Sequence, residues 1–341
     1  DFVVFGRQLI ADPETGNKLL DARPEDVRPC MRCNEECIGR ILRYRSKLSC
    51  AVNPATGDEN AMKLTKVEQP KNVVVIGGGP GGVTPETGGM EAARACAIRG
   101  HKVRLYEKNV LGGTLNAPAT AEFKIQIRKL IEYYKVQLNK LGVEIHEYTE
   151  LSIDSPILAE CDRIVCATGS KPLSLPIPGI NGSNVLGVID AHLKPELVTG
   201  RNLIICGGGM SGCDFALEAM TALGRKATVI EMKDDVATDV IMMNQISLKE
   251  SMAEAGVALR CGCRVKEITG NGVVVINKDG GEELIEGDQV ISAFGQTPDK
   301  DMVNKLRDKY YKKTIFIGDC VKAAKSGDAI RGGYCAALSI N

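Results

Sequence analysis

Tryptophan is absent from this sequence, histidine occurs only three times, and neither acidic nor basic residues are in excess. His101, His146 and His192 stand alone, so a histidine-based metal site or hydrolytic triad is not expected, and each is interpreted as a surface or strand-end residue. With 43 residues of each charge, the chain offers no basic surface for nucleic acid or anionic lipid. No apolar run reaches the length of a membrane span and no signal peptide opens the chain, so we expect a cytoplasmic protein.

Cysteine, by contrast, is abundant. The thirteen cysteines are scattered through apolar runs such as residues 163–167, which is typical of reduced thiols and not of a disulfide scaffold. Neither Cys206 and Cys213 nor Cys261 and Cys263 have the spacing of a redox dithiol. A disulfide reductase is therefore disfavoured.

Four cysteines share one short stretch with the spacing C-x2-C-x3-C-x12-C: Cys30, Cys33, Cys37 and Cys50. Four thiolates can hold a 4Fe–4S cluster, one per iron. Four can also hold structural zinc, but such sites usually contain two CxxC pairs, and only one pair here has that spacing. The pattern favours an iron–sulfur cluster, with zinc or unligated thiols as alternatives. Basic residues nearby would raise the cluster potential if they approach it, although most are interpreted as a solvated face: Arg28, Arg32, Arg40, Arg43, Arg45 and Lys47.

A β-branched run at residues 72–76 predicts a buried strand that leads into a glycine-rich turn. Gly77, Gly79 and Gly82 form the pattern GxGxxG, which lets the backbone approach a pyrophosphate at a helix N-terminus. The next predicted strand ends at Glu107, whose carboxylate can hold ribose hydroxyls. These residues predict a first nucleotide site; the alternative is a vestigial site that keeps only the fold.

The first glycine motif contains an irregularity. Glu107 lies 25 positions after Gly82 but only 18 after Gly89, so residues 83–89 look inserted and the helix is expected to begin near Gly89. Pro85 and the paired glycines make this insert a loop, interpreted either as a flap over the pyrophosphate or as a bulge.

A second glycine motif is more regular. The strand at residues 203–206 leads into Gly207, Gly209 and Gly212, and Glu231 ends the following strand nineteen positions after Gly212. A carboxylate there accepts hydrogen bonds from a free 2′-hydroxyl and repels a 2′-phosphate, so NADH is expected in preference to NADPH. Lys233 nearby could weaken that preference.

These motifs resemble the C-terminal half of the trimethylamine dehydrogenase, 2,4-dienoyl-CoA reductase and 2-enoate reductase family, NADH:flavin oxidoreductases related to old yellow enzyme. The resemblance covers essentially the whole chain. It implies a 4Fe–4S cluster on the four cysteines, FAD in the first glycine-rich domain and NADH in the second. Shorter motifs also support the resemblance: Leu111-Gly112-Gly113-Thr114, Ala167-Thr168-Gly169, Pro178-Gly179, Ala293-Phe294-Gly295 and the run Thr314 to Gly318-Asp319.

The resemblance implies a two-domain α/β fold in which the NADH domain is inserted in the FAD domain, as in glutathione reductase. The residues it implies at FAD are Gly77, Gly79, Gly82, Glu107, Gly113, Ala167, Thr168, Gly169, Gly318 and Asp319. The segments expected along the chain are a barrel remnant at 1–29, the cluster segment at 30–70, FAD-domain parts at 71–175 and 288–341, and the NADH domain at 176–287.

The start of the chain reads as one strand, residues 1–5, and a turn at Gly6 and Arg7. In the family this is the last strand of a (β/α)8 barrel, where the Gly-Arg turn approaches an FMN phosphate; a plain strand exit is the alternative. Because the rest of the barrel is missing, we expect a fragment of a longer enzyme or one piece of a split enzyme. Its partners would be an FMN barrel, a small-molecule substrate and further copies of itself.

The predicted function is an oxidoreductase that passes electrons from NADH through FAD and the cluster to FMN, for reduction of an activated C=C bond in an enoate, enoyl-CoA or bile-acid type substrate. One alternative is an amine dehydrogenase with ADP in place of FAD and electrons leaving through the cluster. Another is a non-catalytic electron-relay subunit.

Overall fold

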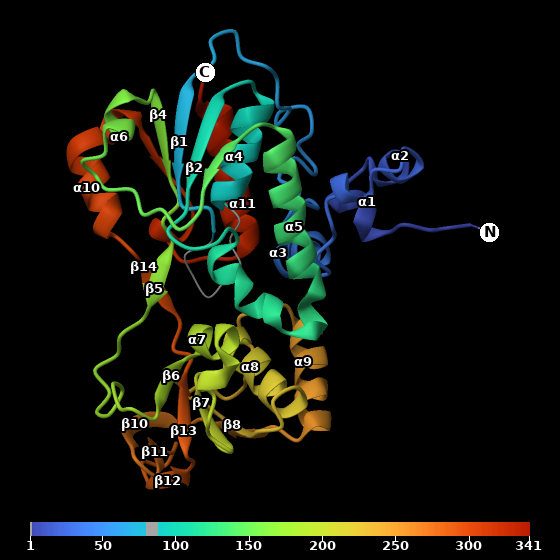
Figure 1. Cartoon of the computed structure of the whole chain (residues 1–341). Coiled ribbons are helices and arrows are strands. Elements are labelled where there is room, and N and C mark those ends of the chain that lie inside the picture. The colour runs from blue at the N-terminus through green and yellow to red at the C-terminus, as the bar shows by residue number, and fades with distance from the viewer. Residues whose placement is uncertain (1, 80–87) are drawn as a thin grey trace. The chain divides into compact units, whose positions relative to one another are not determined.

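The computed structural model describes residues 2–79 and 88–341, and the chain forms two compact units (Figure 1). The first unit comprises the chain up to Lys171 together with Gln296–Asn341, and the second comprises Pro172–Gly295. The second unit therefore interrupts the first, which confirms the predicted insertion of one nucleotide-binding domain in another. The insertion was predicted at residues 176–287, inside the observed span.

The first unit is built on a parallel sheet with strand order β15-β4-β1-β2-β3. Its central strand, β1, carries an unbroken apolar run with Val73, Val74 and Val75 fully buried, as expected for a parallel strand covered on both faces. The bounds are Asn72–Ile76 for β1, Lys102–Tyr106 for β2, Glu144–His146 for β3, Arg163–Cys166 for β4 and Thr314–Phe316 for β15.

Two helices of this unit, α4 (Gly88–Ile98) and α11 (Ser326–Ser339), lie side by side (Figure 1). A Cβ on Gly333 would come within 2.1 Å of the Gly88 carbonyl oxygen, so glycine is required for this close helix packing. Helix α5 (Ile125–Lys140) packs against α4 and buries Leu130, Tyr134 and Leu138. Shorter helices complete the unit: α6 (Pro156–Glu160) and α10 (Asp301–Tyr310).

The second unit repeats the parallel sheet with strand order β6-β13-β7-β8-β9 and adds an antiparallel sheet, β10-β11-β12. The parallel strands are β6 (Val185–Gly187), β7 (Asn202–Cys206), β8 (Lys226–Glu231), β9 (Ala258–Cys261) and β13 (Gln289–Ser292). The antiparallel strands are β10 (Arg264–Thr269), β11 (Gly272–Ile276) and β12 (Glu282–Glu286), and the helices are α7 (Val188–Leu193), α8 (Met210–Thr221) and α9 (Met242–Ala255). The connecting segments pair as β5 (Ser170–Pro172) and β14 (Gln296–Pro298).

The predicted strand at the start of the chain is wrong. Residues 2–5 form no strand, and Phe2, Val3 and Val4 are exposed. A strand needs a neighbour to pair its backbone N–H and C=O groups, and the described residues provide none here. Helices follow instead: α1 (Arg7–Ala11), α2 (Thr15–Leu20) and, after the first cysteines, α3 (Arg40–Tyr44).

Among the residues described, every helix is too short or too polar to cross a membrane.

Candidate functional site

The four cysteines of the spaced motif lie around one pocket in the first unit. Cys30, Cys33, Cys37 and Cys50 are half-buried and line it together with Arg7, whose predicted contact was with an FMN phosphate. Cys37 belongs to a π-helix, Glu35–Gly39, a rare element that is frequent at functional sites. Before it the chain turns through left-handed conformations at Arg32 and Asn34, with φ of 56° and 59°.

Four thiols around one pocket supply the number of sulfur donors that a 4Fe–4S cluster or a structural zinc ion requires. Burial raises the pKa of Cys33 to about 12 and also raises that of Cys50, so a cationic centre is needed to keep these groups as thiolates.

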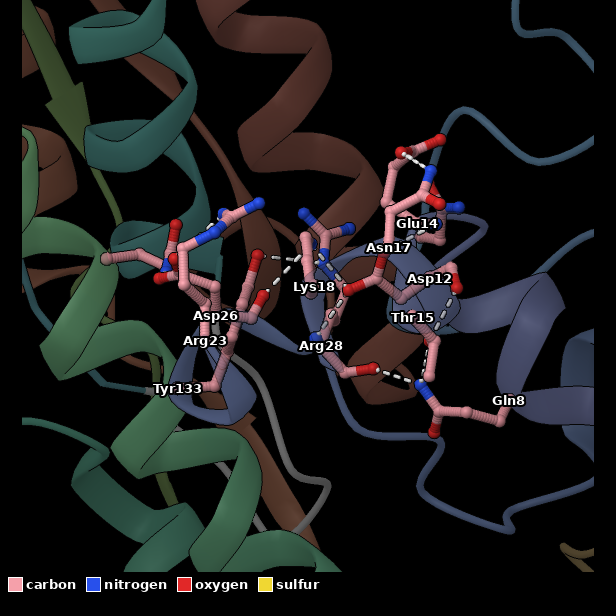
Figure 2. Close-up of polar contacts among 12 residues, drawn as sticks. Gln8, Asp12, Glu14, Thr15, Asn17, Lys18, Arg23, Asp26, Arg28 and Tyr133 are labelled. Carbon is pink, nitrogen blue, oxygen red and sulfur yellow. Dashed lines mark hydrogen bonds and ion pairs between the residues drawn. The ribbon is translucent and has the colours of Figure 1, made fainter. Parts of the chain in front are cut away.

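Residues of the amino-terminal helices bind the segment that precedes the first cysteine, and Figure 2 shows the contacts of Gln8 and Asp12 with Arg28. The Gln8 side chain accepts a hydrogen bond from the Cys30 amide at 2.9 Å and donates one to the Arg28 carbonyl at 2.9 Å. The buried Asp12 carboxylate accepts from the Arg28 amide at 2.8 Å and binds Lys18 at 2.6 Å. This segment was predicted as a barrel remnant, and in the structure its contacts position the first cysteine.

Arg28 links the cysteine segment to the helix that follows the first glycine turn. Its guanidinium is buried, donates to the Tyr133 hydroxyl at 3.2 Å and to the Val52 carbonyl, and lies 3.9 Å from Glu91 of α4. Arg94 makes two hydrogen bonds of 2.8 Å to the same carboxylate. Burial opposes ionisation of Glu91, but Arg94 and Arg28 outweigh it and hold the pKa of Glu91 below its usual value.

Arg28 is thus an exception to the solvated face predicted for the basic residues around the cysteines. The exposed ones are Arg32, Arg43, Arg45 and Lys47, and Arg40 is half-buried.

The predicted FAD residues gather at the carboxyl ends of the first unit's parallel strands. Gly77 has φ of 98°, and a Cβ there would come within 2.1 Å of the Ala167 carbonyl oxygen. A Cβ on Gly79 would come within 2.3 Å of Gly113. No side chain fits where the first glycine turn contacts Ala167 and Gly113, so glycine is required at both positions. The backbone there stays accessible to a phosphate group.

Two acids complete this group. Glu107 accepts hydrogen bonds from the Gly78 amide at 2.8 Å and the Asn109 amide at 2.9 Å. Asp319, which follows Gly318 (φ of 67°), is buried, accepts from the Ala324 amide at 2.8 Å and pairs with Ser170 at 3.2 Å. The remaining predicted residues, Thr168 and Gly169, follow Ala167 at the end of β4, whereas Gly82 lies outside the described residues.

The predicted NADH residues form a matching arrangement in the second unit. Gly207 has φ of 117°, and a Cβ added there would come within 2.3 Å of the Ala293 carbonyl oxygen. Glu231 accepts from the Gly208 amide at 2.8 Å and the Lys233 amide at 2.9 Å, as Glu107 does in the first unit. The Lys233 ammonium donates to Thr238 at 3.1 Å.

A geometry shared by the two units identifies the glycine that packs each helix onto its strand. A Cβ on Gly212 would come within 2.0 Å of the Gly207 carbonyl oxygen, and a Cβ on Gly89 would come within 1.8 Å of the Gly77 carbonyl oxygen. Gly89 therefore makes the contact in the first unit that Gly212 makes in the second. The sequence spacing agrees, since Glu107 lies 18 positions after Gly89 and Glu231 lies nineteen positions after Gly212.

Replacing either glycine is expected to weaken ligand binding only in the unit that contains it. Gly89→Ala and Gly212→Ala should each cost about 1–3 kcal/mol of unfolding free energy, because the added methyl displaces the helix. FAD retention should fall with Gly89→Ala and NADH affinity with Gly212→Ala, measured by flavin content after dialysis and by fluorescence titration. Gly16→Ala is the control, since the methyl group it adds would meet nothing within 4 Å beyond its chain neighbours. Equal loss of both ligands in either variant would contradict this assignment.

Sequence reasoning missed Asp239, which lies at the second glycine turn. Its carboxylate oxygens accept from the Met210 amide, the first of α8, at 3.2 and 3.3 Å, and Gly209 lies next to the same side chain. A dinucleotide pyrophosphate at this helix N-terminus would have to displace it. No motif signals Asp239, because it lies in a loop eight positions after Glu231.

Two of the three histidines, which were predicted to be surface or strand-end residues, are buried. His192 is buried in α7, 2.5 Å from Glu218 and edge-on to Phe215. His101 is buried between the Lys71 amide and the Ile340 carbonyl, and burial lowers its pKa. Only His146 is a half-exposed strand-end residue, stacked on Tyr106. Contacts with neighbouring residues in the fold therefore account for the positions of all three histidines.

Comparison with known proteins places these sites in context. Residues 71–313 match the family described as pyridine nucleotide-disulphide oxidoreductase, which implies FAD and NAD(P)H. Full-chain similarity extends to the NADH oxidase of Thermoanaerobacter brockii, 33% identical over 346 residues, and to the cinnamate reductase of Clostridium sporogenes, 35% identical over 355 residues. The matches cover 100% of this chain but 52% and 50% of those relatives.

A solved structure, a 2-naphthoyl-CoA reductase in complex with 2-naphthoyl-CoA, superposes with a TM-score of 0.91 at 32% identity, covering 98% of this chain and 50% of that one. The chain thus spans about half the length of the relatives it matches, and the resemblance predicted from the sequence is confirmed. The family match over both glycine turns, together with their shared geometry, shows that the chain belongs to the pyridine nucleotide-disulphide oxidoreductases, a family of NAD(P)H-dependent flavoproteins.

Proposed function

We propose that this chain is the NADH-oxidising, electron-supplying part of an ene-reductase. The observation that carries the proposal is the presence of two glycine-rich strand-to-helix turns and a four-cysteine pocket in one chain. A bound FAD would accept a hydride from NADH, leaving NAD+, and could give up the two electrons singly, and a 4Fe–4S cluster on the four cysteines would supply a one-electron carrier. The relatives named as cinnamate reductase and 2-naphthoyl-CoA reductase support an activated C=C bond as the final acceptor.

The side chains have distinct tasks in this proposal. Gly77 and Gly79 admit the flavin pyrophosphate to the backbone, and Glu107 is placed for the ribose. Gly207 and Glu231 do the same for NADH. The four cysteines would hold the cluster, and the contacts of Gln8, Asp12 and Arg28 keep their loops in position.

An FMN-bearing barrel, supplied by a further part of the same protein or by a partner subunit, would receive the electrons and carry the substrate groups. We also propose self-association and a cytoplasmic location. The alternative amine dehydrogenase, with ADP in the first nucleotide site, predicts that neither nicotinamide nucleotide reduces a bound flavin. The second unit's intact glycine turn and Glu231 favour the reductase instead.

Glu231 provides a direct test of cofactor choice. The wild-type chain is expected to bind NADH more tightly than NADPH, because the 2′-phosphate meets the Glu231 carboxylate. Glu231→Gln should weaken NADH binding roughly tenfold through loss of a charged hydrogen-bond acceptor, and NADPH binding much less. Both dissociation constants can be measured by anaerobic fluorescence titration, with Glu254→Gln, which changes a carboxylate on α9, as the charge-matched control. Equal effects on both nucleotides would contradict the proposed contact.

A further inference from the structure

The loop that follows β8 folds back onto the second glycine turn and is fixed there. The Ala237 amide donates to the Gly208 carbonyl at 2.7 Å, and both Val236 and Ala237 are fully buried. A Cβ on Gly208 would come within 2.8 Å of a Val236 methyl carbon, so the loop packs directly on the turn. From the other side, the Gln245 side chain of α9 donates to the Val236 carbonyl at 2.7 Å. The loop backbone is therefore held in one place beside the turn.

Asp239 extends from this fixed loop to the amino end of α8. Both of its carboxylate oxygens accept from one donor, the Met210 amide, at 3.2 and 3.3 Å. These distances are at the long end of the range for N–H···O hydrogen bonds, and the carboxylate is exposed. A side chain held in this way can rotate away from the amide while the loop backbone stays where it is.

The position that Asp239 occupies is the one that a dinucleotide pyrophosphate requires. A glycine-rich turn of this kind places the pyrophosphate on the first amides of the following helix, and Met210 is the first residue of α8. Glu231, on the same turn, accepts from the Gly208 amide and can also accept from ribose hydroxyls. Asp239 differs from Glu231 in this respect, because a pyrophosphate has no proton to donate and two anions at one amide repel each other.

We propose that Asp239 is an internal competitor for the dinucleotide pyrophosphate, which holds the Met210 amide in the free protein and releases it when the nucleotide binds. The inference rests on the nucleotide site proposed in the second unit and adds a residue that sets its affinity. The apparent affinity of the site is reduced by the fraction of molecules in which Asp239 covers the amide. Because the pyrophosphate is common to NADH and NADPH, Asp239 weakens both equally, whereas Glu231 acts at the ribose and distinguishes them.

Asp239→Asn is the variant that tests the charge with little change in shape. An asparagine oxygen accepts from a helix amide much as an aspartate oxygen does, so the contact with Met210 is kept while the charge is removed. The dissociation constants of NAD+ and NADP+ should both fall, roughly threefold to tenfold. Anaerobic isothermal titration calorimetry of the full chain measures them, and the oxidised nucleotides avoid flavin reduction. Adenosine, which lacks the pyrophosphate, should bind with unchanged affinity.

Two further variants separate competition from other effects of the substitution. Asp234→Asn is the charge-matched control, because Asp234 lies in the same loop, is 82% exposed and pairs with Lys278. It should leave NAD+ binding unchanged. Asp239→Ala removes the contact altogether, so it should lower the unfolding temperature slightly and still bind NAD+ more tightly than the wild-type chain. A purely structural role for Asp239 predicts instead that stability and affinity fall together.

The outcomes distinguish this inference from the proposed function. Binding heat that Gly212→Ala weakens is assigned to the second unit. The inference alone is overturned if NAD+ binds there but Asp239→Asn leaves its affinity unchanged or lowers it, or if Asp234→Asn raises the affinity equally. If neither the wild-type chain nor Asp239→Asn binds NAD+, the inference and the proposed function are both overturned.

Discussion

Replacing Cys33 with serine is expected to remove the iron–sulfur absorption and the labile sulfide while NADH still bleaches the flavin. The four cysteines surround one pocket, so the loss of one thiolate leaves a cubane iron without its protein ligand. The two nucleotide turns are built from other segments, and the contacts of their described glycines do not involve Cys33. The measurement is an anaerobic spectrum with iron and sulfide analysis, followed by addition of NADH.

Cys335→Ser is the matched control for this prediction. Cys335 is also a free cysteine of the first unit, but it is exposed on α11 and outside the pocket that the spaced cysteines line. It should keep full iron, sulfide and flavin reduction. Loss of both the cluster and NADH-dependent bleaching in Cys33→Ser would instead show that metal binding is required for folding.

Replacing Glu91 with glutamine is expected to cost about 3–5 kcal/mol of unfolding free energy, because it leaves the buried guanidinium groups of Arg28 and Arg94 without a counter-charge. The substitution therefore disturbs both guanidinium partners at once. Chemical denaturation followed by circular dichroism measures the effect. Since Arg28 reaches the Val52 carbonyl two residues after Cys50, the cluster should also become easier to release.

The exposed pair Glu132 and Lys135 provides the control, because it has the same i,i+3 spacing on a helix but side-chain exposures of 66% and 40%. Glu132→Gln should change stability by less than about 1 kcal/mol. A cost for Glu91→Gln as small as that of the control would contradict the account of the buried network.

The same carboxylate predicts a dependence on pH with a definite sign. The pKa of Glu91 is lower in the folded chain than its ordinary value of 4.5, so its contribution is complete above that value and is lost as the pH falls through the folded pKa. The stability difference between wild type and Glu91→Gln should therefore be constant near neutral pH and shrink below about pH 4.5. Denaturation curves at a series of pH values check this; a difference that grows on acidification would contradict it.

The elements most faithfully predicted from the sequence are those in which one local pattern dominates. Residues 72–76 form a strand as predicted, because a continuous β-branched run that leads into a turn is typical of a buried strand in a parallel sheet. The second strand, residues 102–106, instead alternates buried apolar residues with more exposed basic ones. Helix α8 begins at Met210, inside the second glycine motif, and Gly209 is its N-cap. The glycine turns were found because glycine at those positions is required by contacts that repeat in both units.

The failures concern features that depend on distant partners. The strand predicted at residues 1–5 has the right composition but no neighbour to pair with among the described residues. The burial of Arg28 follows from Glu91 and Tyr133, which are far away along the chain, so its local charge pattern indicated only a solvated face.

The most direct test of the central claim is an anaerobic titration of the purified chain with NADH, followed by visible absorbance. If the first unit holds FAD and the second holds NADH, stoichiometric NADH should bleach the flavin band, and NADPH at the same concentration should do so much more slowly. A protein that contains flavin but shows no bleaching with either nucleotide would contradict the account.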